Sequence, residues 1–171
     1  YLTPDTWPTW IGLGLLRVAC WLPHRSALAV GRGLGRIAYR VGGERRAVVR
    51  RNVELCFPEL SGDEREDLVS QHFAALGMSM IEMGLGRWAS DRHLVAMTEI
   101  DGVEHVLEAV NRGQGVILLS AHFTTLELSG RVVKLNIPPF DAVYRRSRSD
   151  FTTEVLRSGR ERSAADTIEK R

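Results

Sequence analysis

The sequence lacks the residue patterns that mark several common kinds of site. It has only two cysteines among its 171 residues. Cys20 lies in an apolar stretch and Cys56 precedes Phe57, so neither has the spacing of a zinc or redox motif. This usage favours packing roles for both thiols in a reducing compartment.

The sequence also lacks an apolar run of the ~20 residues that a bilayer crossing requires. Trp10–Leu22 is nearly all apolar but is broken by Arg17, and further tryptophans stand at Trp7 and Trp21. Tryptophans at both ends of such a run are typical of interfacial anchors. No small-residue cleavage site follows, which argues against a signal peptide. We expect residues 1–24 to form a membrane anchor or interfacial helix, with a buried core helix as the alternative.

The net charge is only +2, but positive charge is concentrated in one segment. Between residues 25 and 51 there are eight arginines and a single acid, Glu44. Helical spacing places four apolar residues on one face and three arginines roughly opposite. These are Val30, Leu34, Ile37 and Val41 against Arg32, Arg36 and Arg40. Such a pattern is typical of a helix on an anionic membrane surface, and arginines after an anchor favour the cytoplasmic side. We expect residues 25–92 to be a helical, basic, membrane-proximal region.

Nucleic-acid and dinucleotide binding are both disfavoured for this segment. No helix-turn-helix, zinc finger or aromatic platform accompanies the arginines. The glycines Gly31, Gly33 and Gly35 follow no predicted strand and lack the spacing of a dinucleotide fingerprint. Further on, Ser61 with the acid three residues later forms a capping box, which predicts the start of a long helix. On that helix we predict His72 to be a buried core histidine.

A short apolar run leads into the most informative stretch of the chain. Val116–Ala121 has the pattern of a strand covered on both faces in a parallel sheet, although a buried helical turn has a similar pattern. His122 follows it, and Glu127 begins a segment with helical rhythm. Side chains five positions apart on one helix point about 140° away from each other, so only a strand-to-helix turn brings these two together. Open α/β sheets place their ligand crevices at such turns.

The chemistry of such a pair is specific. A neutral imidazole with a pKa of ~6.5 can take a proton from a hydroxyl. A carboxylate on the other ring nitrogen fixes the tautomer and stabilises the imidazolium. No Gly-x-Ser-x-Gly elbow and no cysteine lies near His122, so we predict a general base without a covalent enzyme intermediate. The spacing alone leaves open a strand-end histidine bonded to a backbone carbonyl, with Glu127 simply solvated.

From about residue 97 onward, short strand patterns alternate with helical ones. Strands are predicted at 98–100, 116–121 and 141–144, and helices at 103–111, 124–134 and 152–162. The alternation predicts an α/β fold with a mostly parallel sheet flanked by helices, preceded by the N-terminal membrane-associated helical region. Residues 93–171 would be the first part of this core. Because the sequence starts without methionine and ends without a stop signal, we expect the C-terminal part of the domain to be missing.

Several motifs resemble those of a known family. His122-x-x-x-x-Glu127 after a predicted buried strand resembles the H-x4-D/E motif of glycerolipid and lipid A acyltransferases. Other stretches resemble the lipid A late acyltransferases, and most closely their lauroyl-transferring members. These stretches are YLTP with WPTW in residues 1–10, RNVELCFPE at 51–59, GMSMIEMG at 77–84 and VYR at 143–145. The resemblance covers essentially the whole chain.

The resemblance implies transfer of a fatty acyl chain, lauroyl in particular, from acyl carrier protein to a hydroxyl of a lipid A precursor. It implies work in lipopolysaccharide biosynthesis on the cytoplasmic face of the bacterial inner membrane, with His122 as base and Glu127 orienting it. No metal, other cofactor or nucleic acid is implied. The alternatives are another glycolipid or a lysophospholipid as acceptor, or a non-enzymatic basic membrane-surface module.

Substrate-binding residues are expected near the same rim of the sheet. Arg145 follows the strand that ends at Tyr144, and the resemblance implies a phosphorylated acceptor that guanidinium groups can hold bidentately. Arg160 matches the position of a functional arginine in the family. Its role, as an oxyanion donor or a phosphate anchor, is left open.

Overall fold

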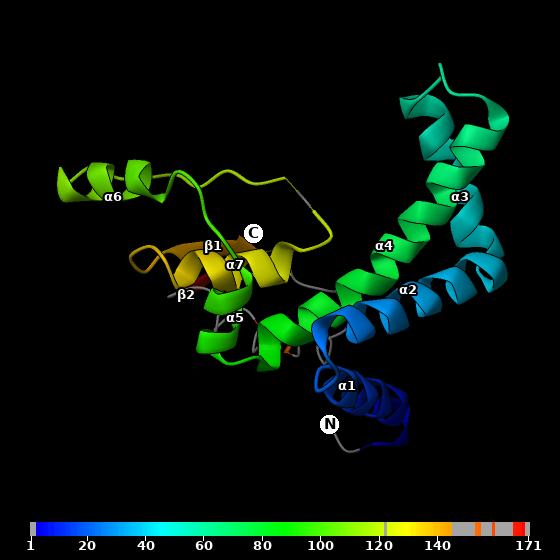
Figure 1. Cartoon of the computed structure of the whole chain (residues 1–171), viewed down its shortest axis with the longest axis horizontal. Coiled ribbons are helices and arrows are strands. Elements are labelled where there is room, and N and C mark those ends of the chain that lie inside the picture. The colour runs from blue at the N-terminus through cyan, green and yellow to red at the C-terminus, as the bar shows by residue number, and fades with distance from the viewer. Residues whose placement is uncertain (1–2, 122, 145–152, 155–158, 160–165, 170–171) are drawn as a thin grey trace. The chain divides into compact units, whose positions relative to one another are not determined.

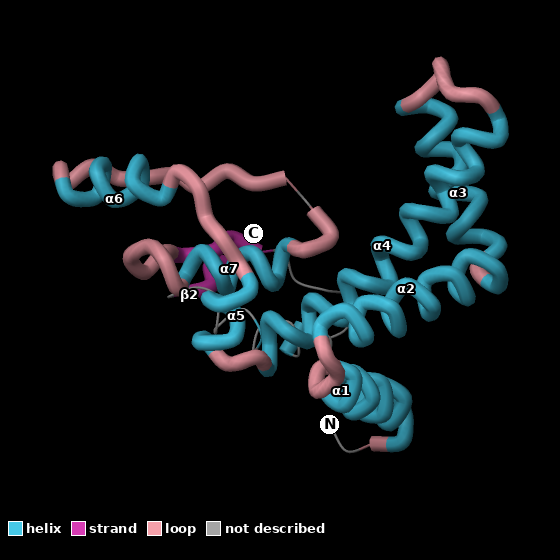
Figure 2. The backbone as a smooth tube through the Cα atoms, viewed as in Figure 1, coloured by secondary structure: helices cyan, strands magenta, loops and turns pink. Residues whose placement is uncertain are grey.

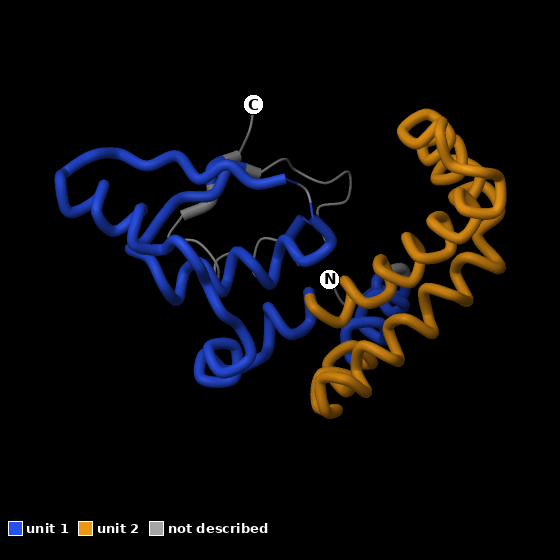
Figure 3. The backbone as a smooth tube through the Cα atoms, turned by 45° about the horizontal axis from the view of Figure 1, so that its top comes forward, with its two compact units in different colours: residues 1–14, 83–171 blue, residues 15–82 orange. Residues whose placement is uncertain are grey.

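Helices dominate the part of the chain that the computed structural model describes, which comprises residues 3–121, 123–144, 153–154, 159 and 166–169 (Figures 1 and 2). After a short 3₁₀ turn the elements are α1 (Trp7–Ala19), α2 (His24–Val41), α3 (Gly43–Cys56), α4 (Gly62–Trp88), α5 (Asp91–Met97), α6 (Val103–Asn111), α7 (Leu126–Lys134), β1 (Asp141–Tyr144) and β2 (Asp166–Glu169). They form two compact units, coloured separately in Figure 3. We call residues 15–82 the helical unit, and residues 1–14 with 83–171 the mixed unit.

In the helical unit, α2 and α4 lie side by side with their backbones in contact (Figure 1). A Cβ added at Gly35 would lie 2.1 Å from the Phe73 carbonyl oxygen, and one added at Gly77 would lie 2.0 Å from the Gly31 oxygen. Only glycine permits so close an approach. Two of the three glycines in the 31–35 segment therefore serve helix packing, whereas Gly33 faces open space.

A small hydrophobic core joins α3 to α4 in the same unit. Val53, Val69 and Phe73 are buried together, and the partly buried residues Tyr39, Val49 and Leu68 pack against them. His72, next to Phe73, is exposed, so the prediction of a buried core histidine is wrong. The interior side of α4 runs through Val69, Phe73 and Gly77, and His72 lies beside this stripe and outside it.

The predicted capping box is confirmed at the start of α4. The Ser61 amide donates to the Glu64 carboxylate at 2.8 Å, and the Glu64 amide donates to the Ser61 hydroxyl at 3.3 Å. Two amides that have no partner inside the helix are thereby satisfied. The Ser61 hydroxyl and the Ser61 amide both stabilise the charged carboxylate, which holds the pKa of Glu64 below its usual value.

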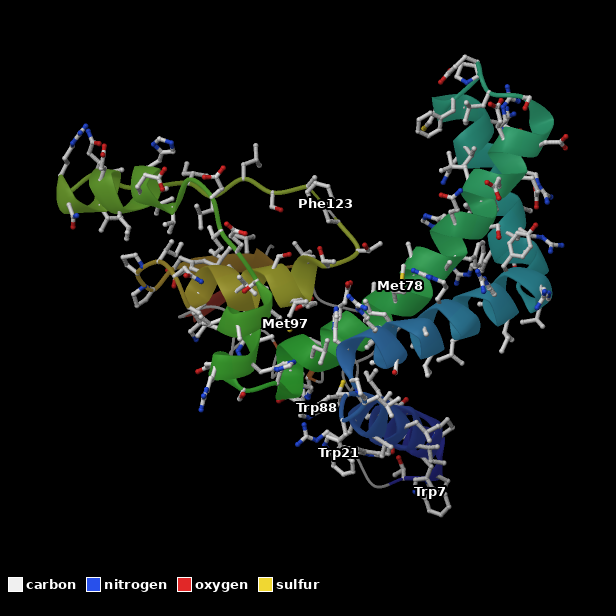
Figure 4. The ribbon with its side chains drawn as sticks, viewed as in Figure 1. Trp7, Trp21, Met78, Trp88, Met97 and Phe123 are labelled. Atoms are coloured by element: carbon white, nitrogen blue, oxygen red, sulfur yellow. The ribbon has the colours of Figure 1, made fainter. Side chains whose placement is uncertain are left out.

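No residue of α1 is buried, although the helix is strongly apolar. Trp7 is 58% exposed and Trp21, just beyond the helix, is 71% exposed; both side chains extend outward in Figure 4. None of the helices in the described ranges combines the length and the apolar character that a membrane crossing demands. The assignment of residues 1–24 as an anchor, an interfacial helix or a core helix stays a prediction.

In the mixed unit, β1 and β2 pair in parallel, with Asp141 opposite Asp166 and Tyr144 opposite Glu169. The structure confirms the strand predicted at 141–144, but it shows no strand at 98–100 or at 116–121. The latter segment is part of the long loop between α6 and α7 in Figure 2, and Ile117 and Leu119 are 94% and 96% exposed. Strands are stabilised by hydrogen bonds to neighbouring strands and by burial, and this segment has neither in the described chain.

Helix predictions fare better in this unit. The helix predicted at 103–111 coincides with α6, and the helix predicted at 124–134 begins two residues later, at Leu126. The helix predicted at 152–162 lies largely outside the described residues. Two paired strands of four residues do not test the mostly parallel α/β sheet, which stays a prediction, as does the division at residues 24 and 92.

Candidate active site

Glu127 lies in the first turn of α7 and is half-buried. The chain reaches it through turns: the Phe123 amide donates to the Ala121 carbonyl at 2.9 Å, and the Leu126 amide donates to the Phe123 carbonyl at 3.2 Å. Turns leading directly into a helix are therefore present at this point, but the strand predicted before them is not. His122 itself lies outside the described residues, so the pairing of the two side chains stays a prediction.

A buried arginine that sequence reasoning missed holds α7 in place. Arg131 is 3% exposed and donates from Nη1 to the Gly86 carbonyl at 2.8 Å and from Nη2 to the Ala89 carbonyl at 3.2 Å. It also forms an ion pair with the Asp91 carboxylate. The sequence held one signal for its burial: Arg131 lies one turn after Glu127 and is followed by two valines. A charge buried among apolar residues requires hydrogen-bonding partners.

The backbone at the start of α7 lies against the last turn of α4. A Cβ added at Gly86 would be 3.3 Å from both the Glu127 carbonyl oxygen and the Leu128 Cα. The next residue, Arg87, has its Nη1 atom 3.6 Å from where a Cβ of Gly159 would lie. Consecutive residues of α4 thus lie near Glu127 and near Gly159, the residue before position 160.

The remaining predicted site residues lie partly or wholly outside the described part of the chain. The backbone of Tyr144 ends β1 in register with Glu169, while its side chain is outside the description. Arg145 and Arg160 lie outside the described residues. Within the described ranges, no group of three or more His, Cys, Asp or Glu side chains is placed to hold a metal ion.

The helical unit contains a separate polar cluster, which we call the Glu66 cluster. Arg50 binds the Glu66 carboxylate through two hydrogen bonds of 2.8 Å, and the Tyr39 hydroxyl donates to the same carboxylate. Arg46 donates to the Tyr39 carbonyl at 3.0 Å. The Arg50 and Tyr39 bonds lower the pKa of Glu66 to about 2, and the bond to the carboxylate raises the pKa of Tyr39.

A shallow pocket of about 360 Å³ adjoins this cluster. It is lined by Tyr39, Asp63, Glu66, Asp67 and Ser70. None of these was predicted as a site residue. Tyr39 of α2 and Arg50 of α3 both bind Glu66 of α4, so the cluster joins the three helices. These mutual hydrogen bonds give it the character of a structural network.

Around its axis, α2 presents three different faces. Ala27, Gly31 and Gly35 are buried. The apolar stripe Val30, Leu34, Ile37 and Val41 is exposed, as are Arg32, Arg36 and Arg40. The predicted amphipathic pattern is therefore present, but the apolar stripe is not what packs against α4. An exposed apolar stripe on a basic helix is the geometry of an interfacial helix.

The whole chain, residues 1–171, matches one protein family, and the protein belongs to the bacterial lipid A biosynthesis acyltransferases. The resemblance seen in the motifs is thereby confirmed. The chain is 35% identical over 170 residues to the lipid A biosynthesis lauroyltransferase of Escherichia coli K12, covering 99% of this chain and 55% of the relative.

Two further relatives match with similar coverage. The E. coli K12 lipid A biosynthesis palmitoleoyltransferase is 34% identical over 163 residues, which are 95% of this chain and 53% of that protein. A lipid A biosynthesis acyltransferase of Haemophilus influenzae is 32% identical over 173 residues, covering 100% of this chain and 55% of the relative. The chain thus spans about half the length of these relatives. No solved structure matches it.

Proposed function

We propose that this protein is an O-acyltransferase of lipopolysaccharide biosynthesis, which moves a fatty acyl chain, lauroyl in particular, from acyl carrier protein to a hydroxyl of a lipid A precursor. The observation that carries the proposal is the family match along all 171 residues. The H-x4-E motif, with Glu127 in the first turn of α7, supplies the residues for the chemistry.

The proposed reaction is direct transfer. His122, oriented by Glu127, takes the proton of the acceptor hydroxyl, and the resulting alkoxide attacks the thioester carbonyl of the acyl carrier. The tetrahedral intermediate collapses with cleavage of the carbon–sulfur bond, and the carrier thiolate takes the proton back from the imidazolium. A donor to the developing oxyanion is worth ~3–4 kcal/mol in comparable acyl-transfer sites.

Arg145, Arg160 and Tyr144 are proposed to bind the substrates. A phosphorylated acceptor calls for guanidinium groups, which hold phosphate oxygens bidentately. Arg160 would serve as the oxyanion donor or as a phosphate anchor. Its proposed place near the motif is supported by the preceding residue, Gly159. Gly159 lies near Arg87, and the Glu127 backbone lies near Gly86, the residue before Arg87 on α4.

We further propose that the protein works at the cytoplasmic face of the bacterial inner membrane and that the exposed stripe of α2 rests on anionic lipid. The exposed apolar surface of α1 supports the same location. The arginine face of α2 would also suit an acidic acyl carrier protein. A mostly parallel α/β sheet is the proposed fold of the core, supported by the parallel pairing of β1 and β2.

The test is an acyl-transfer assay on the full-length protein with a lipid A precursor and carriers loaded with lauroyl, myristoyl, palmitoyl or palmitoleoyl chains. Product mass spectrometry identifies the chain and the acceptor. His122→Ala should lower the rate ~10²–10⁴-fold, the usual contribution of a general base. Glu127→Gln should lower it by a smaller factor, because it removes the orienting charge and leaves the base.

His105→Ala is the matched control, because His105 is an exposed histidine on α6. It should retain wild-type rates. Undiminished transfer by His122→Ala would refute the base assignment. Acylation of a lysophospholipid in preference to the lipid A precursor would replace the acceptor. Salt-sensitive vesicle binding without any turnover would favour the non-enzymatic membrane module.

A further inference from the structure

Arg131 carries a charge into the interior of the mixed unit, where a charge requires compensation. Its guanidinium reaches three acceptors on one side: the Gly86 carbonyl, the Ala89 carbonyl and the Asp91 carboxylate. The planar fork suits this arrangement, because its N–H groups lie in fixed directions. An exposed arginine would not need three acceptors, and Arg131 is not part of the H-x4-E motif.

The acceptors belong to the corner between α4 and α5. Gly86 lies in the last turn of α4 and Ala89 follows its end, where backbone carbonyls have no partner within the helix. The negative end of the helix dipole also favours a cation there. Asp91 is the first residue of α5, whose N-cap Ser90 accepts a hydrogen bond from the His93 amide. One side chain of α7 therefore fixes the end of one helix and the start of the next.

The same corner touches the backbone at Glu127. Arg131 is one turn beyond Glu127 on α7, so the two residues lie on the same side of that helix. Gly86 accepts from Arg131 and also lies against the Glu127 carbonyl and the Leu128 Cα. The start of α7 is thus held at two points on one residue of α4, by a hydrogen bond and by a close backbone contact that is tight for an added methyl group.

We infer that Arg131 is a positioning residue for acyl transfer, which holds α7 on Gly86 so that the Glu127 carboxylate is presented to its histidine. This inference rests on the proposed function. Displacement of a catalytic group by about 1 Å can cost ~10²-fold in rate. Loss of the clamp should therefore lower kcat more than it changes KM for either substrate, because the chemistry and not the binding surface is displaced.

The experiment compares Arg131→Lys with wild type in the full-length protein, alone and combined with Glu127→Gln. Lysine keeps the charge but cannot serve three acceptors with a rigid fork. We expect kcat to fall ~10–100-fold with KM changed less than threefold. In the Glu127→Gln background the same substitution should cost less than threefold, because the group that it positions is already disabled. Arg112→Lys, at an exposed ion pair just after the end of α6, is the control and should leave kcat unchanged.

A purely structural role predicts a different pattern: kcat per folded molecule would be unchanged, or the loss would be equally large in both backgrounds, and either result overturns the inference. If Arg131→Lys does not fold, Gly86→Ala decides, because it keeps the arginine and requires the Glu127 backbone to give by a few tenths of an ångström. It should lower kcat ~3–10-fold, and an unchanged kcat would overturn the inference. An inactive wild type would instead refute the proposed function.

Discussion

Alanine substitutions at two neighbouring glycines of α2 should have opposite effects on stability. At Gly33 nothing lies within 4 Å of an added Cβ, so alanine gains helix propensity at no steric cost. This gain is ~1 kcal/mol in a helix interior. At Gly35 the same methyl group would lie 2.1 Å from the Phe73 oxygen and 2.8 Å from the Ala74 Cα, both backbone atoms of α4.

The magnitude at Gly35 follows from these distances. Ordinary contacts lie at 3.4–4 Å, so α2 and α4 must separate by about 1 Å to admit the methyl group. Overpacking of this kind costs ~1–3 kcal/mol and occasionally more. The cost exceeds the propensity gain, and we expect Gly35→Ala to be less stable than Gly33→Ala by ~2 kcal/mol or more. For a chain of this size that difference corresponds to ~4–8 °C in Tm.

Thermal and urea unfolding followed by far-ultraviolet circular dichroism would measure both variants against wild type. Because each variant changes one glycine of one helix to the same residue, differences in the unfolded state largely cancel. Equal stabilities, or a Gly35→Ala variant more stable than Gly33→Ala, would refute the backbone contact between α2 and α4.

Two further predictions concern the helical unit. Leu34→Ser should weaken binding to anionic vesicles ~5-fold, because it removes a half-exposed leucine worth ~1 kcal/mol from the apolar stripe of α2. The control Val95→Ser, on α5, should change binding less than twofold. Equal losses for the two variants in a vesicle sedimentation assay would contradict the role of the stripe. The pKa of Glu66 is lowered from 4.5 to about 2, so its stabilising contribution is complete above pH 4.5 and is lost as the pH falls toward 2. Solvent screening at this partly exposed pair reduces that contribution to ~1 kcal/mol, so Glu66→Gln should be less stable than wild type by that amount at pH 7. The difference should shrink as the pH falls through 2. A pH-independent difference in urea midpoints would contradict the linkage.

Local rules predicted much of the secondary structure. The capping box at Ser61, helix α6 and strand β1 each follow from a few adjacent residues, and all are present. The face on which α2 packs was not predictable in this way. Its interior side consists of Ala27, Gly31 and Gly35, and backbone contact through glycine leaves no hydrophobic pattern.

Residues whose state depends on distant partners were the hardest to predict. Val116–Ala121 has the composition of a buried strand, but strand formation depends on neighbouring strands, which composition does not supply. Arg131 was missed for the related reason that a buried charge is explained by its acceptors, which come from residues 86–91 of α4 and α5. The His122/Glu127 pair stays a prediction, which the spacing alone left open and the family motif favoured.

The open loop before α7 has a consequence for the protein at high concentration. Ile117 and Leu119 are 94% and 96% exposed even after β1 has formed, because among the described residues β1 pairs with β2 and not with this segment. Residues 116–121 form an uncharged, mostly apolar and proline-free hexapeptide, and exposed segments of this kind nucleate intermolecular sheets. At high concentration, copies of the chain would therefore associate through Val116–Ala121.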